Sequence, residues 1–349
     1  MASFMRTHLV QQWPSRFCSD PFVPFALSGH FRSELRLLYP ETLKRTHQGI
    51  VTFKFGVEAH SSLADMSSSS SEGGDILDEH CFRSLYNQKL FEETVSKKEI
   101  IPEVGFNCNE EYPEVIEHIY KRGWRRLVSP KTEVSKTMIR EFYANANRSK
   151  EEMEDLEVHP YTSYIRGVQI NFSSTNIRRV MRFKEETPGA ENNFDNMQTR
   201  DPQLDAVIRD LCIQGATWKM GTGRNPKPIQ LRRQELRPLA RGWQELIIHN
   251  IIPTGNKSEI TISRAVLIHS IMQGDDVRAE ELITDNMVII AQGIEGKGFL
   301  GFPSTIYKIC KEAGVRMREF KHIEQVPEER YITVKVMEAI RIPRMIQQN

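Results

Sequence analysis

The chain has 349 residues, of which 39% are hydrophobic and 27% are charged, and its formal net charge is +1. The length permits two domains, but the modest share of hydrophobic residues favours one sizeable domain flanked by segments without a core. A net charge near zero excludes a polyanion-binding bias of the whole molecule, so any nucleic-acid-binding face has to be local.

The five cysteines are scattered along the chain and form no CxxC pair. This pattern argues against a disulfide scaffold and a zinc knuckle, and it favours a reducing intracellular compartment, either the nucleus or the cytoplasm. No apolar run reaches the roughly 18–20 residues that cross a bilayer, so no membrane partner is expected.

Residues 1–78 are predicted to form a disordered leader that ends in a Ser-rich linker. The stretch 61–75, SSLADMSSSSSEGGD, cannot bury enough apolar surface to offset the entropy lost on ordering. Arg6 and Arg16 precede the first acidic residue, which is typical of transit peptides, but prolines interrupt this stretch and it shows no amphipathic period. A poorly ordered leader is therefore the preferred interpretation.

Residues 79–325 are predicted to form a mainly α domain, a multi-helix bundle with one short β-ribbon. Apolar residues that recur at three- and four-residue steps predict helices over residues 82–93, 112–120, 134–146, 175–183, 204–211, 236–252, 262–273, 277–291 and 304–313. β-Branched and aromatic residues between 161 and 172, around Arg166-Gly167, predict the ribbon. We expect a solvated acidic turn over 151–157 and a flexible loop over 184–200. The tail, 326–349, is compatible with either a strand or a helix.

The centre of the predicted bundle is an antiparallel helical hairpin from Leu236 to Gly274. Its first arm ends at Ile252, because the residue before a proline avoids the helical region. Ser258 or Thr261 can cap the second arm, and Gly274 can end it. Both arms are apolar enough to be buried.

Five stretches in a specific order carry a family resemblance: Glu141–Ala146 (EFYANA), Tyr164–Val168 (YIRGV), Trp243–Thr254 (WQELIIHNIIPT), Arg264–Gln273 (RAVLIHSIMQ) and Gly301–Pro303 (GFP). Together they resemble the plant transposon protein domain family, over roughly residues 115–322. The resemblance implies an origin in mobile-element coding sequence. It implies no established activity and no catalytic residues, so no site is carried over from it.

A mobile-element origin raises the alternative of a metal-dependent, transposase-like nuclease, which needs acidic residues converging on two cations. The available aspartates are Asp201, Asp205, Asp210, Asp275, Asp276 and Asp285. The predicted elements lack the run of consecutive strands that an RNase-H-like sheet requires, and Asp275-Asp276 suits the start of the helix over 277–291. No catalytic residue, metal ligand or cofactor is therefore assigned.

Other candidate sites have plainer interpretations. His249 and His269, on the two arms of the hairpin, could approach each other as metal ligands, but polar side chains satisfied by the backbone are the favoured interpretation. The loop Gly293–Gly301 precedes a helix, yet Phe299 stands where a phosphate-binding Walker motif requires lysine. Cys310 lies on an apolar helix stripe, which is typical of a packed core thiol.

Basic segments carry the strongest functional signal. The candidate nucleic-acid-binding residues are Arg224, Lys227, Arg232, Arg233 and Arg237, which precede the hairpin. Two further clusters are Lys121, Arg122, Arg125 and Arg126 around Trp124, and Arg178, Arg179, Arg182 and Lys184. Basic side chains can follow phosphates while an aromatic ring stacks on a base, although helices also display solvated charges.

The sequence thus predicts a non-enzymatic, transposable-element-derived protein that is either a structural assembly component or associated with nucleic acid. Its expected partners are nucleic acid, through a local basic segment, and a second copy of itself. Two alternatives stay open at this point: the nuclease, and a decayed element copy with no present activity.

Overall fold

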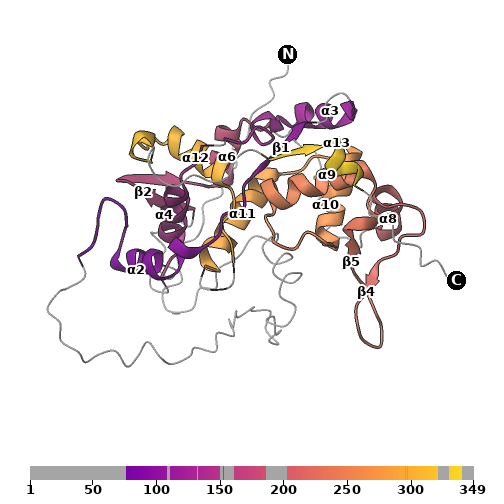
Figure 1. The fold of residues 1–349 in the computed structure, drawn as a ribbon, viewed down its shortest axis with the longest axis horizontal. Helices are drawn as coiled ribbons and strands as arrows, with labels where there is room; N and C mark the ends of the chain where they lie inside the picture. Colours follow the sequence, from indigo (N-terminus) through magenta and orange to yellow (C-terminus); the bar gives the residue numbers. More distant parts are fainter. Residues whose placement is uncertain are drawn as a thin grey trace, which may run out of the picture. The chain divides into compact units, whose positions relative to one another are not determined.

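The computed structural model describes residues 76–107, 111–131, 133–149, 152, 161–185, 203–294, 296, 298–320 and 330–339 (Figure 1). Three predicted features lie wholly or largely outside these residues: the leader with its linker, the acidic turn over 151–157 and the loop over 184–200. None of the described helices is both long and apolar enough to span a bilayer.

The helices fall close to the stretches expected from apolar spacing. They are α2 (Leu85–Glu93), α3 (Pro113–Arg122), α4 (Lys136–Ala146), α6 (Ser174–Met181), α8 (Leu204–Leu211), α9 (Pro238–Leu246), α10 (Ile262–Gln273), α11 (Ala279–Gln292), α12 (Pro303–Glu312) and α13 (Val334–Glu338). Short helical turns are η1 (Val95–Lys97), η2 (Trp124–Arg126), η3 (Arg233–Glu235), η4 (Ile247–Ile251) and η5 (Met317–Phe320). Serine side chains cap α2, α4 and α6 by accepting a backbone N–H of the first turn.

The fold is mixed α/β, so the prediction of a mainly α bundle with one β-ribbon is wrong. The strands are β1 (Val104–Asn107), β2 (Thr162–Ile165), β3 (Val168–Asn171), β4 (Lys219–Met220), β5 (Pro228–Arg232), β6 (Glu259–Thr261) and β7 (Arg330–Thr333). They form three small sheets: parallel β1–β7, antiparallel β2–β3, and antiparallel β4–β5–β6. The strands of the first and third sheets have only two to five residues, and no two-residue turn joins them, so neither an alternating pattern nor a turn signal identifies them.

The ribbon β2–β3 is the one sheet that the sequence predicted correctly. Arg166 and Gly167 connect its strands with φ angles of 47° and 80°, as in a two-residue turn whose twist matches that of the strands. Asn145 of α4 holds the ribbon by donating to the carbonyl oxygen of Tyr164 at 2.8 Å, and Ser163 donates to that of Phe142 at 2.6 Å. The ribbon therefore packs on α4.

The parallel pair joins two segments that are far apart in the chain. Asn250 fixes β1, since its side-chain amide both accepts from the N–H and donates to the carbonyl oxygen of Val104, each at 2.9 Å. After β7 the chain forms α13, whose end Arg241 binds by donating to the carbonyl oxygens of Met337 and Ala339, each at 2.9 Å. The described part of the tail is thus a strand followed by a short helix.

The predicted helical hairpin is confirmed as α9 with η4, followed by α10, and these helices lie centrally in Figure 1. Trp243 is buried at its centre, with the rings of Phe106 and His118 in edge contact at centroid distances of 5.4 and 6.0 Å. Gly274, with φ 80°, ends α10 as expected. The last turn of the first arm, η4, is π-helical, which the sequence pattern does not show.

Candidate nucleic-acid interface

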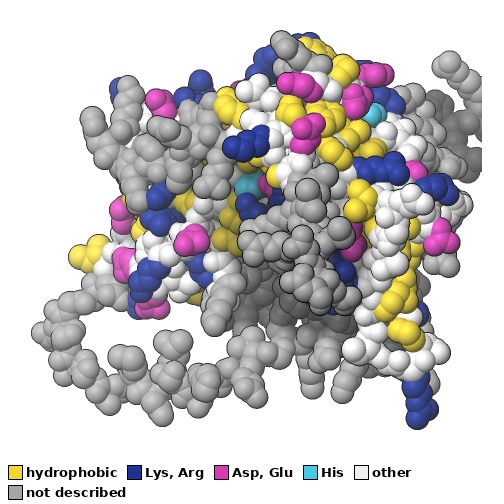
Figure 2. All heavy atoms as spheres, turned by 45° about the vertical axis from the view of Figure 1, so that its right-hand side comes forward, with side chains coloured by type: hydrophobic (Ala, Val, Ile, Leu, Met, Phe, Trp, Pro, Cys, Tyr) yellow, Lys and Arg dark blue, Asp and Glu magenta, His cyan; other side chains and the backbone are white. Residues whose placement is uncertain are grey.

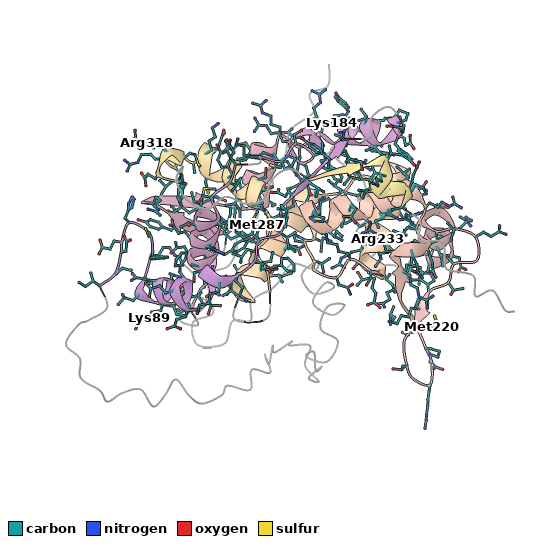
Figure 3. All side chains as sticks on the ribbon, in the orientation of Figure 1. Lys89, Lys184, Met220, Arg233, Met287 and Arg318 are labelled. Atoms are coloured by element: carbon teal, nitrogen blue, oxygen red, sulfur yellow. The ribbon has the colours of Figure 1, made fainter. Side chains whose placement is uncertain are left out.

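The β4–β5 hairpin projects from its sheet, and its loop carries two of the predicted nucleic-acid-binding residues, Arg224 and Lys227 (Figures 1 and 3). Both side chains are exposed, and neither forms an ion pair within the part of the chain that the structure describes. Figure 2 shows Lys and Arg atoms at the free end of this projection and hydrophobic atoms along it. The hairpin therefore presents uncompensated positive charge to solvent.

Local sequence explains how the hairpin forms. The N–H of Gly221 donates to the carbonyl oxygen of Lys227 at 2.8 Å and closes the loop. Gly223 has a φ of 147°, which a glycine adopts without strain. At the base, Leu231 of β5 is paired with Ile260 of β6, and both side chains are fully buried. The base of the hairpin is thus fixed in the core, whereas its loop is exposed to solvent.

The next two predicted residues lie on the body of the fold and are already paired. Arg232 is exposed and lies 3.3 Å from Glu235. Arg233 forms an ion pair with Glu245, a buried carboxylate on α9. Arg232 and Arg233 are therefore neutralised by carboxylates, whereas Arg224 and Lys227 in the loop form no ion pair with a described residue.

Arg237 and the neighbouring Arg241 bind backbone carbonyl groups. Arg237 donates through Nε to Cys212 at 2.8 Å, and Arg241 donates to Leu236 at 2.9 Å in addition to α13. Arg241 is buried, so burial lowers the pKa of its guanidinium. Arg237 and Arg241 therefore hold the segments after α8, before α9 and after α13 close to α9.

A buried charged cluster surrounds Glu245 and includes one of the singled-out histidines. His249 donates through Nδ1 to the carbonyl oxygen of Pro102 at 2.8 Å, and its Nε2 lies 3.1 Å from Lys257 Nζ. The same Nε2 lies 3.5 Å from a carboxylate oxygen of Glu245, which also pairs with Arg233. The cluster joins η3, α9, η4 and the loop before β6, so we assign it a structural role.

The charge of Glu245 makes stability depend on acid pH. Burial by itself raises the pKa of this carboxyl, but the contact with His249 and the positive charge of Arg233 outweigh burial and lower the pKa below its ordinary value of 4.5. A lowered pKa in the folded state contributes stability above the ordinary pKa, and this contribution is lost as the pH falls through the folded value. We expect Glu245→Gln to reduce the free energy of unfolding by about 2 kcal/mol at pH 7.

Urea unfolding at neutral pH and at about pH 3 checks this expectation, with exposed Glu99→Gln as the matched control. The difference between wild type and Glu245→Gln should shrink as the pH falls below the ordinary pKa of a glutamate. A difference that stays constant across this range would show that the carboxylate charge is not what stabilises the cluster.

Two basic side chains of the cluster around Trp124 bind the C-terminal end of α10. Trp124 is buried. Arg122 donates to the carbonyl oxygens of Ile271 and Asp275, at 3.1 and 2.6 Å, and Lys121 donates to that of Gly274. Two positive charges therefore lie at the C-terminal end of α10, where the helix dipole favours them.

Most of the other basic side chains near Trp124, and of the third cluster at residues 178–184, also contact other parts of the fold. Arg125 lies over the ring of Tyr120 at 3.9 Å, and Arg126 donates to the carbonyl oxygen of Val180. The ion pairs of the third cluster are Arg178–Glu280 and Arg179–Glu312. Arg182 and Lys184 are exposed.

The aspartates considered for a nuclease are not gathered into a metal site. Asp201 lies outside the described residues, whereas the other aspartates belong to α8, to the turn before α11 and to α11 itself. Within the described ranges, no group of three His, Cys, Asp or Glu side chains is arranged to hold a metal ion. The helix after Asp275-Asp276 begins only at Ala279, so this pair does not supply the cap expected from the sequence.

The two histidines and Cys310, which the sequence singled out, lie in the packed interior. His269 Nδ1 lies 3.4 Å from Asp210, whereas His249 faces Pro102 and Lys257, so the two histidines do not share a ligand position. Cys310 is fully buried, and burial raises the pKa of its thiol.

The glycine loop before α12 leaves no open phosphate site at that helix. The carboxylate of Glu103 already accepts from the backbone N–H groups of Ser304 and Thr305, where an anion bound by the helix N-terminus would lie. Gly301 serves close packing, because a Cβ there would lie 2.9 Å from Pro253 Cγ.

The structure places exposed apolar residues, which the sequence did not single out, on the same hairpin as Arg224 and Lys227. Met220 and Ile229, on the two strands of the hairpin, are 46% and 43% exposed, and Figure 3 labels Met220 at its base. Pro226 is exposed in the loop between Arg224 and Lys227. The proline-rich loop flanked by β-branched Ile229 was a turn signal that could have located the hairpin.

Comparison with protein families gives a match over the central part of the chain. The family model described as "Putative plant retrotransposon-related domain" matches residues 120–316, more than half of the chain. No curated protein and no solved structure matches the chain. The matched residues include the β4–β5 hairpin and the central helices, whereas β1 and β7 lie outside them.

Proposed function

The chain belongs to the plant retrotransposon-related domain family, and from this premise we propose that it is a non-enzymatic nucleic-acid-binding protein of retroelement origin. The observation that carries the proposal is the basic β4–β5 hairpin. Arg224 and Lys227 lie at its free end without an ion-pair partner among the described residues. Nucleus and cytoplasm are both compatible with this function.

Electrostatics supports the hairpin loop over the basic residues that directly follow it. A cation gains most from a phosphate when no internal carboxylate already neutralises it, because the release of counterions from the nucleic acid then supplies the free energy of binding. Arg232 and Arg233 are paired with Glu235 and Glu245, so they add less. No acidic residue occurs between Lys219 and Arg232, and Glu259 of β6 pairs with Lys219 at the base of the hairpin, away from Arg224 and Lys227 in the loop.

We expect the double variant Arg224→Ala, Lys227→Ala to bind a DNA duplex roughly 10- to 100-fold more weakly than wild type at 0.1 M salt. The slope of log K against log salt concentration should become shallower by about 2, one unit for each lost phosphate contact. Fluorescence anisotropy of the full chain with a labelled duplex, measured over a salt series, gives both quantities.

A matched control removes two positive charges elsewhere. Lys311 and Arg318 are exposed near the end of α12, so Lys311→Ala, Arg318→Ala has the same net charge as the hairpin variant. It should keep wild-type affinity and slope. Equal losses in both variants would show a general charge effect and refute the assignment to the hairpin.

The other functions expected from the sequence have weaker support. Self-association as a structural component stays a prediction, because no described surface favours it over the hairpin's role. The nuclease alternative gains no support from the described carboxylates, which belong to separate elements.

A further inference from the structure

The loop of the β4–β5 hairpin combines positive charge with an exposed proline. Pro226 lies between Arg224 and Lys227, and all three are exposed. Gly221 and Gly223 precede them with only Thr222 between, so the other side of the loop carries little side-chain bulk. The result is a slim tip with one rigid apolar ring between two cations.

The apolar character continues from the tip toward the body. Ile229 lies two residues before buried Leu231 in β5 and is itself 43% exposed, so apolar side chains continue from the base of the hairpin toward its loop. Met220 on the opposing strand, which is paired with Pro228, adds a second exposed apolar side chain, 46% exposed. A surface that receives these side chains would remove their apolar area from water, which is favourable.

We infer that this hairpin enters the minor groove of double-stranded DNA and that Pro226 inserts between two base pairs and bends the duplex. The inference rests on the proposed nucleic-acid-binding function and names its ligand. Proteins of the minor groove insert apolar wedges, proline included, between base steps, and place arginine in the groove where its negative potential is strongest. The hairpin supplies the wedge in Pro226 and the cations in Arg224 and Lys227.

The chemistry favours a duplex over a single strand. Proteins that follow single strands stack bases on aromatic side chains, and residues 219–232 contain none. Trp218, just before β4, is partly buried and donates to the carbonyl oxygen of Leu204, so its indole packs against the rest of the fold. Aliphatic and proline side chains suit a wedge between base pairs, because they replace stacking contacts without needing hydrogen-bond partners.

The test uses the full chain and a duplex of about 30 base pairs with a donor and an acceptor dye at its ends. Wild type should raise energy transfer between the dyes, and it should bind a duplex with a central mismatch roughly ten-fold more tightly, because unstacking there costs less. Pro226→Ala should bind the intact duplex within roughly ten-fold of wild type but lose most of the bend and the mismatch preference. Pro113→Ala, an exposed proline at the start of α3, is the matched control and should bend DNA as wild type does.

Each outcome separates this inference from the proposed function. Two results would leave the proposed function intact but overturn the insertion of Pro226. The first is salt-sensitive binding by wild type that depends on Arg224 and Lys227 but does not bend the duplex, and the second is bending that Pro226→Ala does not change. Equal or tighter binding to a single strand of the same length, or binding to anionic lipid vesicles in place of DNA, would also overturn the insertion. Absence of binding to any nucleic acid would refute the proposed function itself.

Discussion

Replacing Glu103 by alanine is expected to lower the free energy of unfolding by about 3–5 kcal/mol. The carboxylate is buried between β1 and the start of α12, where it accepts from the backbone N–H of Ser304, from that of Thr305 at 3.1 Å and from the Thr305 hydroxyl at 2.6 Å. Burial raises the pKa of this carboxyl in spite of these hydrogen bonds and of nearby Lys308. Alanine leaves the three donors buried without an acceptor, and each such donor costs roughly 1–3 kcal/mol.

The measurement is chemical unfolding at neutral pH, with Glu99→Ala as the control. Glu99 lies in the same segment and its side chain is exposed, so its loss should change the free energy by less than about 0.5 kcal/mol. If Glu103→Ala were as mild as the control, the carboxylate would not be the group that fixes the start of α12.

Gly123→Ala is the second substitution with a large expected effect, a loss of about 3 kcal/mol or more. Gly123 ends α3 with φ 69°, a conformation that costs an alanine roughly 1–2 kcal/mol. A Cβ at this position would also lie 2.8 Å from the carbonyl oxygen of Arg182 and 2.8 Å from the backbone N of Lys184. Because these are backbone atoms after α6, they cannot rotate away as a side chain can.

Gly215→Ala isolates the contribution of this close approach. Gly215 has a similar φ of 85°, but a Cβ there would meet nothing within 4 Å. Gly215→Ala should lower the free energy of unfolding only by the cost of placing alanine at a positive φ, about 1–2 kcal/mol. Thermal or urea unfolding of the two variants should therefore differ by 1 kcal/mol or more, and equal losses would contradict the contact between the ends of α3 and α6.

Glu103 also shows how the family-matched residues depend on the rest of the chain. It lies before residue 120, where the match begins, yet it binds the start of α12 inside the match. β1 and β7, both outside the match, pair with each other, and α13 docks on α9 through Arg241. A stable form of this domain therefore needs segments on both sides of the matched residues.

The helices were predictable because their signals are local. Apolar spacing, the serine caps of α2, α4 and α6, and the left-handed glycines Gly123 and Gly274 all act within a few residues. The ribbon β2–β3 was predictable for the same reason, since Arg166-Gly167 marks its turn. The family resemblance was confirmed as well, and it rests on these same buried stretches.

By itself, the sequence determined the helices, the ribbon, the central hairpin and the existence of a basic segment, because each depends on neighbouring residues. The tertiary structure decided the mixed α/β fold, because β1 meets β7 across more than two hundred residues and no local period records such a pair. It also decided which cations are free. Arg233 meets Glu245 and Arg122 meets the end of α10, whereas Arg224 and Lys227 lie beyond the reach of the described carboxylates. Whether a charge is neutralised depends on distance in space, and that distance exists only once the chain has folded.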